Sequence, residues 1–446
     1  MARARAPRAA GRCAALPHRG GGLTGDLAVR GAAVVVDDGV REVDLLIEAG
    51  RVSALGDVPR AREELDATGL TVFPGIVDAH VHLNEPGRTE WEGFAAGTAG
   101  AAAGGTTTVC DMPLNSLPPT LDRTSFEAKR TALESGAVVD VALWGGATSA
   151  EATLEELRDA GALGVKVFMS DSGAPEFPRL EDDGLRAILA RAGSLGLLVA
   201  VHAEDEATLR QAHGARPPDA EIHAVRRLLG FAAAAKARVH VVHASNADVV
   251  DEVVAARHAG VDATVETCPH YLVFDDAEVA RHGALLKCAP PIRDDAARER
   301  LWERVLRGDV DLIASDHSPS TRELKSGDIR SAWGGVTGVQ TLLPAMLTEA
   351  VYARGLPLPA LARLLSHGPA RRLGLAPQKG AIAVGADADL VLIDLEREWT
   401  FESSMLHARS GLSPYVGRRF RGAIRRTLLR GATPRRGRLI RPVART

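Results

Sequence analysis

The stretch Phe73-Pro-Gly-Ile-Val-Asp-Ala-His80-Val-His82 is an apolar run that ends in two histidines. Its composition predicts a buried strand over Phe73–His80, and alternate residues on a strand point to the same face. His80 and His82 can therefore converge on one point, where neutral imidazole is a good ligand for zinc and related metals. An isolated pair of this kind is more often two ordinary polar or packed histidines, so the rest of the chain must decide.

Further apolar, strand-like runs follow at intervals and alternate with helix-forming segments. The runs are Thr106–Asp111, Val138–Trp144, Gly164–Phe168, Leu197–His202, Val239–His243, Asp262–Thr267 and Asp311–Asp316. The helical segments, with apolar residues spaced near 3.6, include Thr153–Ala160, Asp183–Leu195, Ala247–Ala259 and Ala296–Leu306. Continuous apolar strands alternating with helices indicate a parallel sheet, and eight such units predict an α/β fold of the (β/α)8 TIM-barrel type.

Short strand-like runs also lie near both ends of the chain. They are Asp26–Gly31, Ala33–Val36, Val43–Ile47, Arg51–Leu55, Leu390–Ile393, Ile424–Leu429 and Gly437–Ile440. We expect them to form one small β-sandwich domain from residues 25–72 and 377–446, with the catalytic barrel spanning 73–376. Residues 1–24 are Arg-rich and lack acidic residues; we interpret them as a disordered or mis-started extension, with an organellar transit signal as the alternative.

Composition excludes several classes of protein. The apolar fraction is 46%, the charged fraction is 25% and the formal net charge is −3, which gives no reason to expect a nucleic-acid partner. No apolar run is long enough to predict a membrane span. The four cysteines form no C-x-x-C pair, which favours a reducing, cytoplasmic location over a disulfide framework.

In a barrel of this type the chemistry lies at the carboxyl ends of the strands. Lys166 lies within an apolar strand, and a lysine is almost never fully buried unless it is paired. Either a carboxylate pairs with it, or its amine is neutral, or carbon dioxide has converted it to a carbamate that can bridge two metals. Three other strands end in an imidazole or a carboxylate. Together these positions predict a two-metal site formed by His80, His82, Lys166, His202, His243 and Asp316.

The order His-x-His, Lys, His, His, Asp resembles the binuclear cyclic-amidohydrolase branch of the amidohydrolase superfamily. That branch includes dihydroorotases, hydantoinases (dihydropyrimidinases) and allantoinases, and the likeness runs from about Asp26 to the C-terminus. Several further phrases are similar to those of allantoinases. They are His80-Val-His-Leu-Asn-Glu-Pro-Gly-Arg-Thr-Glu-Trp-Glu-Gly93, Asp111-Met-Pro-Leu-Asn-Ser-Leu-Pro-Pro119, Lys287-Cys-Ala-Pro-Pro-Ile-Arg293, Ser315-Asp-His-Ser-Pro319 and Leu412-Ser-Pro-Tyr-Val-Gly417.

The resemblance implies two divalent ions, with zinc as the default and manganese, cobalt, nickel or iron as alternatives. The two histidines of the opening motif would hold the more buried ion together with Asp316, and His202 with His243 would hold the other. Lys166, carboxylated by carbon dioxide to N6-carboxylysine, would bridge the two ions. Asp316 would also be the catalytic base, carrying a proton from the attacking water to the ring nitrogen. Family members are usually homotetramers.

Three positions bear on the substrate. Dihydroorotases typically meet the carboxylate of their substrate with an arginine and an asparagine, at positions occupied here by Asn84 and Leu114. Hydantoinases usually have a tyrosine where this chain has Asp171, a polar group suited to the ureido arm of allantoin. The resemblance therefore implies hydrolysis of allantoin to allantoate, with a hydantoinase as the main alternative; dihydroorotase or a non-catalytic scaffold fits less well. Family analogy also implies substrate contacts at Asn84, Asp171, Ala289, Ser318 and Gly334, although Gly334 is equally consistent with a plain turn.

Overall fold

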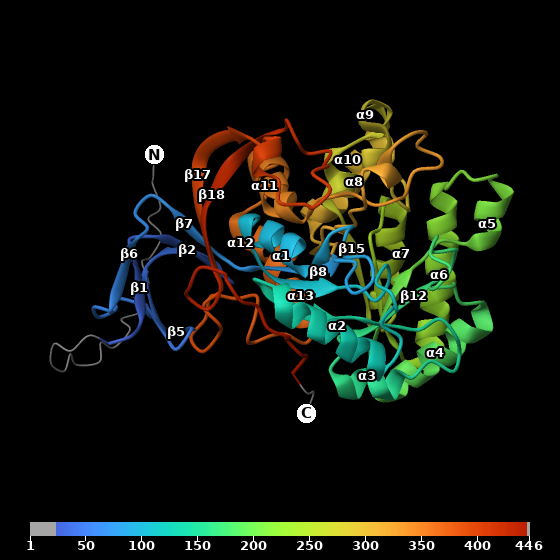
Figure 1. The fold of residues 1–446 in the computed structure, drawn as a ribbon, viewed down its shortest axis with the longest axis horizontal. Helices are drawn as coiled ribbons and strands as arrows, with labels where there is room; N and C mark the ends of the chain where they lie inside the picture. The colour runs from blue at the N-terminus through green and yellow to red at the C-terminus, as the bar shows by residue number, and fades with distance from the viewer. Residues whose placement is uncertain (1–23, 444–446) are drawn as a thin grey trace, which may run out of the picture.

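The computed structural model describes residues 24–443 and contains a parallel eight-stranded barrel beside a small β domain (Figure 1). The bond that closes the barrel runs from His82 N to the carbonyl oxygen of His317, at 2.7 Å, next to a parallel bridge between Val81 and His317. The predicted (β/α)8 fold is therefore confirmed. The barrel strands are β8 (Ile76–Val81), β9 (Thr106–Asp111), β10 (Asp140–Leu143) continued by β11 (Gly145–Gly146), β12 (Gly164–Phe168), β13 (Leu198–His202), β14 (Arg238–Val241), β15 (Ala263–Thr267) and β16 (Leu312–Ile313).

Helices surround this barrel, as Figure 1 shows. The four helical segments expected from the 3.6 spacing agree with α3, α4, α7 and α10 to within one residue at each end. Outward-facing valines of the strands, such as Val165, Val199 and Val239, are fully buried between strands and helices. The helices are α1 (Gly93–Ala103), α2 (Arg123–Gly136), α3 (Leu154–Ala160), α4 (Asp182–Leu195), α5 (Glu206–Gln211), α6 (Pro218–Ala235), α7 (Ala247–His258), α8 (Pro269–Val273), α9 (Asp276–His282), α10 (Asp295–Arg307), α11 (Leu342–Met346), α12 (Leu358–Ala362) and α13 (Gly368–Arg372).

The small domain is built from both ends of the chain, as expected, and contains two sheets. The first has the order β5-β4-β1-β6 and the second has the order β18-β17-β7-β2-β3. In Figure 1 the red C-terminal strands of the second sheet lie beside the blue N-terminal strands. The strands are β1 (Leu27–Arg30), β2 (Ala33–Val36), β3 (Gly39–Glu42), β4 (Asp44–Glu48), β5 (Arg51–Gly56), β6 (Glu63–Asp66), β7 (Thr71–Pro74), β17 (Leu390–Thr400) and β18 (Arg419–Leu428).

Two boundaries differ from the sequence-based expectation. The predicted strand Phe73–His80 is divided at Gly75: its first residues belong to β7 of the small domain and the barrel begins at Ile76. The glycine is required there, because a Cβ atom would lie 2.2 Å from the hydroxyl oxygen of Thr107. The run Gly437–Ile440 was wrongly assigned to the small sheet. It lies along barrel strand β10, bonded through its main chain to Val141. Apart from these two changes, the division into a small domain (residues 25–72 and 377–446) and a barrel (residues 73–376) remains our proposal.

A buried ammonium group joins the two domains. Lys379 Nζ lies 2.6 Å from Asp140 of barrel strand β10, 2.9 Å from Asp387 and 2.7 Å from Asp389, and its side chain is fully buried. Arg430 also contacts Asp140. The two aspartates just before β17 are thus tied to the barrel through one lysine.

Among the described residues, no helix has the length and apolar character needed to cross a membrane. Cys110, Cys268 and Cys288 are buried free thiols. The interpretation of the N-terminal extension falls almost entirely on residues 1–23, outside the described residues.

Candidate active site

A cavity of about 380 Å³ opens at the carboxyl ends of the barrel strands. All six predicted metal ligands line it, together with most of the predicted substrate contacts. A volume of this size matches a small-molecule site. The residues that line the cavity include His80, His82, Leu114, Lys166, Asp171, His202, Arg216, His243, Lys287, Ala289, Asp316, Ser318, Ala332, Trp333, Gly334 and Gly335.

One half of the site is formed by the His-x-His motif and the end of the last strand. His80 Nε2 lies 3.3 Å from Asp316 Oδ1, and His82 Nε2 lies 3.5 Å from the same oxygen. Burial alone would raise the pKa of Asp316, but the imidazoles around it outweigh burial and hold that pKa well below its usual value. The carboxyl group is therefore ionised, which is the form that binds a cation.

The other half is formed by β12, β13 and β14. His202 Nδ1 lies 3.0 Å from His243 Nε2. Burial lowers the pKa of His202 and, more strongly, that of His243, and the nearby Lys166 ammonium acts in the same direction. Both imidazoles are therefore neutral near pH 7, as metal ligation requires.

Lys166 is buried at the centre of the site, with its amine 5.0 Å from the centroid of the Phe168 ring, and that ring stacks on His202. Within the described part of the chain, no hydrogen bond or ion pair to its amine is found, so the alternative of a lysine paired with a carboxylate receives no support. Burial lowers the pKa of Lys166 to about 8, although Asp316 and Glu266 oppose the shift. A substantial fraction of this amine is therefore neutral, as reaction with carbon dioxide requires.

The backbone is unusual at two of the predicted ligands. His243 and Asp316 have φ angles of 42° and 43°, in the left-handed region that non-glycine residues rarely occupy. Each lies just beyond the end of its strand, β14 or β16. Left-handed backbone of this kind concentrates at functional sites, where it changes the direction of a side chain.

The side chains fit a metal centre. Two buried imidazole atoms, His243 Nδ1 and His80 Nε2, form no hydrogen bond, although His80 Nε2 lies 3.3 Å from the Asp316 carboxylate. A buried nitrogen without a hydrogen bond is costly unless something else satisfies it. Ligand atoms of His80, His82 and Asp316 all lie within 4.8 Å of one another. Imidazole nitrogens and a carboxylate oxygen are the donors that zinc and other divalent transition ions take.

Two buried glutamates that the sequence reasoning missed hold these imidazoles. Glu266 Oε1 lies 2.6 Å from His80 Nδ1, while its second oxygen lies 3.0 Å from His240 Nε2. Glu204 Oε2 lies 2.7 Å from His202 Nε2. Burial opposes ionisation of both glutamates, but their imidazole partners, aided at Glu204 by Arg216, lower each pKa to about 2. Carboxylates in this position orient a metal-binding imidazole and raise its basicity.

Most of the predicted substrate contacts line the cavity. Asp171, Ala289, Ser318 and Gly334 all do so. Asn84 does not: it is buried and its amide donates to the carbonyl oxygen of Pro319, leaving its Oδ1 without a partner. Its part in substrate binding stays a prediction.

The cavity also contains a guanidinium group that the sequence reasoning missed. Arg216 lies in the cavity wall, with its Nε 3.0 Å from Glu204 Oε1 and its Nη2 also bonded to Glu204. Leu114 lies in the wall, at the position where a dihydroorotase would place a polar asparagine. The wall thus contains both polar and apolar side chains.

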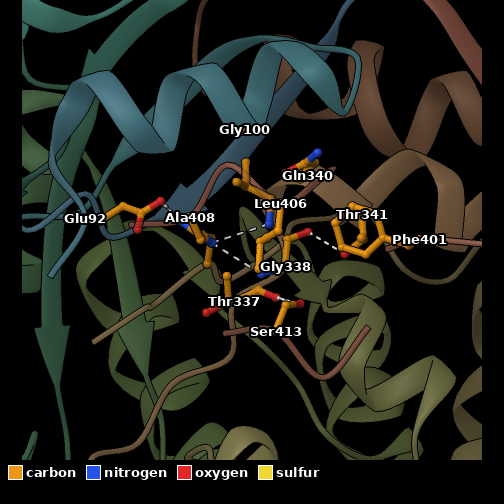
Figure 2. Close-up of a pocket in the computed structure, with 12 residues that line it drawn as sticks. Glu92, Gly100, Thr337, Gly338, Gln340, Thr341, Phe401, Leu406, Ala408 and Ser413 are labelled. Carbon is orange, nitrogen blue, oxygen red and sulfur yellow. Dashed lines mark hydrogen bonds and ion pairs between the residues drawn. The ribbon is translucent and has the colours of Figure 1, made fainter. Parts of the chain in front are cut away.

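A second, much smaller void lies behind the last barrel strand and holds no substrate. Its volume is about 10 Å³, room for about one water molecule. Figure 2 shows Glu92, Thr337, Gly338 and Ser413 around it. Here His317 Nε2 lies 3.3 Å from Glu92 Oε1, and its Nδ1 accepts from Gly338 N at 3.3 Å. This packing supports the chain next to the cavity.

Fold, cavity and ligand set define a class of enzyme. Residues 71–433 match the model of the amidohydrolase family, and the chain belongs to that family. Membership implies a divalent metal site, in agreement with the buried histidines and aspartate of the cavity.

Individual relatives carry a narrower name than the family model does. The chain is 45% identical over 445 residues to a protein of Solibacter usitatus named allantoinase, which covers 94% of this chain and 97% of that protein. It is 48% identical over 427 residues to a Rubrobacter xylanophilus protein of the same name, covering 92% and 94%. Among solved structures, an L-hydantoinase (dihydropyrimidinase) from Arthrobacter aurescens is similar with a TM-score of 0.87 and 33% identity, covering 94% of this chain and 98% of that chain.

Proposed function

We propose that this enzyme hydrolyses the cyclic amide bond of allantoin to give allantoate. The observation that carries the proposal is the convergence of all six ligand side chains in one cavity of about 380 Å³. Relatives named allantoinase at 45–48% identity, over more than nine-tenths of the chain, support the choice of substrate.

Two divalent ions, which we take to be zinc, would be held by the six side chains. His80, His82 and Asp316 would hold one, His202 and His243 the other, with the carbamate of Lys166 between them. When bound, such ions lower the pKa of water and polarise a carbonyl group. Neutral Lys166 amine forms the carbamate by adding to the carbon of carbon dioxide and losing one proton.

The protein's own groups then perform the remaining steps. Asp316 is ionised and lines the cavity, so its carboxylate takes a proton from the attacking water and delivers it to the ring nitrogen that leaves.

The cavity wall favours a ureido substrate. The Asp171 carboxylate can accept hydrogen bonds from the N–H groups of the ureido arm. Arg216 is the one guanidinium among the described cavity-lining residues, and Glu204 already binds two of its nitrogens, which leaves it a poor partner for the carboxylate of dihydroorotate.

A panel of substrates tests the proposal. The purified enzyme is assayed on allantoin, 5-substituted hydantoins, dihydrouracil and dihydroorotate in parallel, and we expect the highest kcat/KM for allantoin. The solved structures it resembles favour a hydantoinase as the second candidate, and faster opening of dihydrouracil would establish that alternative. Asp316→Asn, which keeps the shape but not the charge, should lose turnover while retaining the fold. An enzyme that stays fully active after exhaustive chelation would refute the metal-dependent mechanism.

We also propose a cytoplasmic homotetramer. The buried free thiols are compatible with a reducing compartment, and sedimentation of the purified protein tests the oligomeric state.

A further inference from the structure

One edge of the cavity is a short loop, residues 330–335, which we call the rim segment. The ammonium group of Lys325 lies beneath it and donates to the carbonyl oxygens of Trp333 at 2.8 Å and Gly335 at 2.5 Å. A third bond reaches the carbonyl oxygen of Ala284 at 3.3 Å, in the stretch before the cavity-lining residues 287–289. One charged group therefore connects the rim segment to a second part of the chain.

A second lysine binds other carbonyl groups of the same loop. Lys287 Nζ donates to the carbonyl oxygens of Arg330 and Ala332, each at 2.7 Å. The main-chain oxygen of Lys287 accepts from Gly335 N, also at 2.7 Å. Hydrogen bonds from a charged donor are roughly twice as strong as those between neutral groups. Neither lysine forms an ion pair within the described part of the chain. Both ammonium groups donate to main-chain carbonyl oxygens.

These bonds leave the main-chain N–H and C=O groups of Gly334 available. The N–H groups of Trp333 and Gly335 are bonded to the carbonyls of Leu324 and Lys287. For Gly334, within residues 24–443, no hydrogen bond to either its N–H or its C=O is found, and Gly334 lines the cavity. A cyclic amide offers a matching donor and acceptor, so the orientation of the Gly334 main chain matters for binding.

We propose that Lys325 and Lys287 are positioning residues: their ammonium groups fix the rim segment so that the main-chain N–H and C=O groups of Gly334 face a bound cyclic amide. The proposal rests on the proposed function for its substrate. The two lysines act through the loop and touch no reacting atom. Without either of them, the carbonyl groups that it holds would turn toward water and the rim segment would sample open conformations.

Limited proteolysis tests the positioning without any substrate. Arg330 is a trypsin site inside the rim segment, and its side chain is 88% exposed. Cleavage after Arg330 is followed by mass spectrometry in wild type, Lys325→Met, Lys287→Met and the exposed control Lys236→Met. We expect cleavage at least about five-fold faster in the two rim variants and unchanged in the control, because cleavage follows the population of open conformations.

Steady-state kinetics tests the consequence for binding. In both rim variants we expect KM for allantoin to rise at least about five-fold with kcat within about two-fold of wild type, and with unchanged metal content. Lys325→Arg, which keeps charged donors, should recover part of the lost affinity. Cleavage and KM that both stay within two-fold of wild type would overturn the proposal, as would a fall in kcat alone.

Two further outcomes are separable. If Lys325→Met does not fold, Lys287→Met, whose side chain is more exposed, decides the matter. If wild type opens no cyclic amide at all, the proposed function fails. Faster cleavage after Arg330 in the two rim variants would still support the positioning role of Lys325 and Lys287, and unchanged cleavage would overturn it.

Discussion

Replacing Lys379 by methionine should destabilise the whole protein. Its ammonium group is fully buried and lies within 2.9 Å of three carboxylates. Removing one partner of a buried ion pair costs about 3–5 kcal/mol, because the remaining charge is left uncompensated. Arg430 still contacts Asp140, and Arg438 Nη2 lies 3.3 Å from Asp387. Asp389 is the carboxylate left without a cation.

The assay is urea unfolding at pH 7, monitored by circular dichroism, of wild type and Lys379→Met with Lys236→Met as the exposed control. We expect the free energy of unfolding to fall by about 3–5 kcal/mol in Lys379→Met and to change very little in the control. Adding Asp389→Asn should recover part of the loss, since it removes the orphaned charge. A Lys379→Met protein as stable as wild type would refute the reasoning.

The same lysine predicts a dependence on pH. Burial opposes its charge, but the three aspartates outweigh burial and raise the pKa of Lys379 above 10.5 in the folded protein. A group whose pKa is raised in the folded state contributes fully to the stability of the protein below its unfolded pKa. That stabilisation is lost as the pH rises through the folded-state pKa. Wild type should therefore lose stability above about pH 10.5, and the difference from Lys379→Met should shrink there.

Four further substitutions test other parts of the site. Lys166→Met should abolish turnover and the carbamate signal in ¹³C NMR after incubation with ¹³C-bicarbonate; a fully active variant would remove the carbamate from the mechanism. Glu266→Gln should weaken metal binding by about 10–100-fold in competition with a chelator, and unchanged affinity would show that the carboxylate charge is dispensable. Asp171→Ala should raise KM for allantoin by about ten-fold, or ~1.4 kcal/mol, without affecting dihydrouracil, which has no ureido arm; equal effects on both would contradict its role. Gly335→Ala should cost more than about 1 kcal/mol of stability, because φ is +124° and a Cβ would lie 2.2 Å from a carbonyl oxygen; Gly334→Ala, with 3.9 Å of clearance, is the matched control.

The barrel was predictable because its strands are continuous apolar runs and because the predicted site residues lie within or directly after them. Pattern alone could not assign a short run to its sheet. Gly437–Ile440 is apolar enough to be a strand, but nothing in its composition distinguishes the small domain from β10 of the barrel. The edge strands β3 and β6 were missed for another reason: they are polar and largely exposed, so they lack an apolar signal.

The predicted metal ligands followed from spacing, but the groups that contact them did not. Glu266 carries the same signal that drew attention to Lys166, namely a charged residue inside an apolar strand, and it could have been found in that way. Glu204 lies two residues after His202 and so on the same face of an extended chain. Arg216 lies in a loop and Lys325 ends a short 3₁₀ helix, Glu323–Lys325. Neither segment has a periodicity that relates a side chain to the cavity. Asn84 was placed by family analogy, and only the structure shows that it is turned toward Pro319.

Strand β7 pairs with β17, so two segments separated by the entire barrel must meet to complete one sheet. During synthesis the N-terminal strands leave the ribosome long before their partners exist. The edge of β7 that pairs with β17 therefore stays unpaired while the barrel forms. Closing a loop of roughly 300 residues costs about 5 kcal/mol of chain entropy, a cost that a prefolded barrel reduces by holding the two attachment points in place. We therefore expect a chain that ends before β17 to expose the edge of β7 to other chains, and to aggregate even where its barrel is intact.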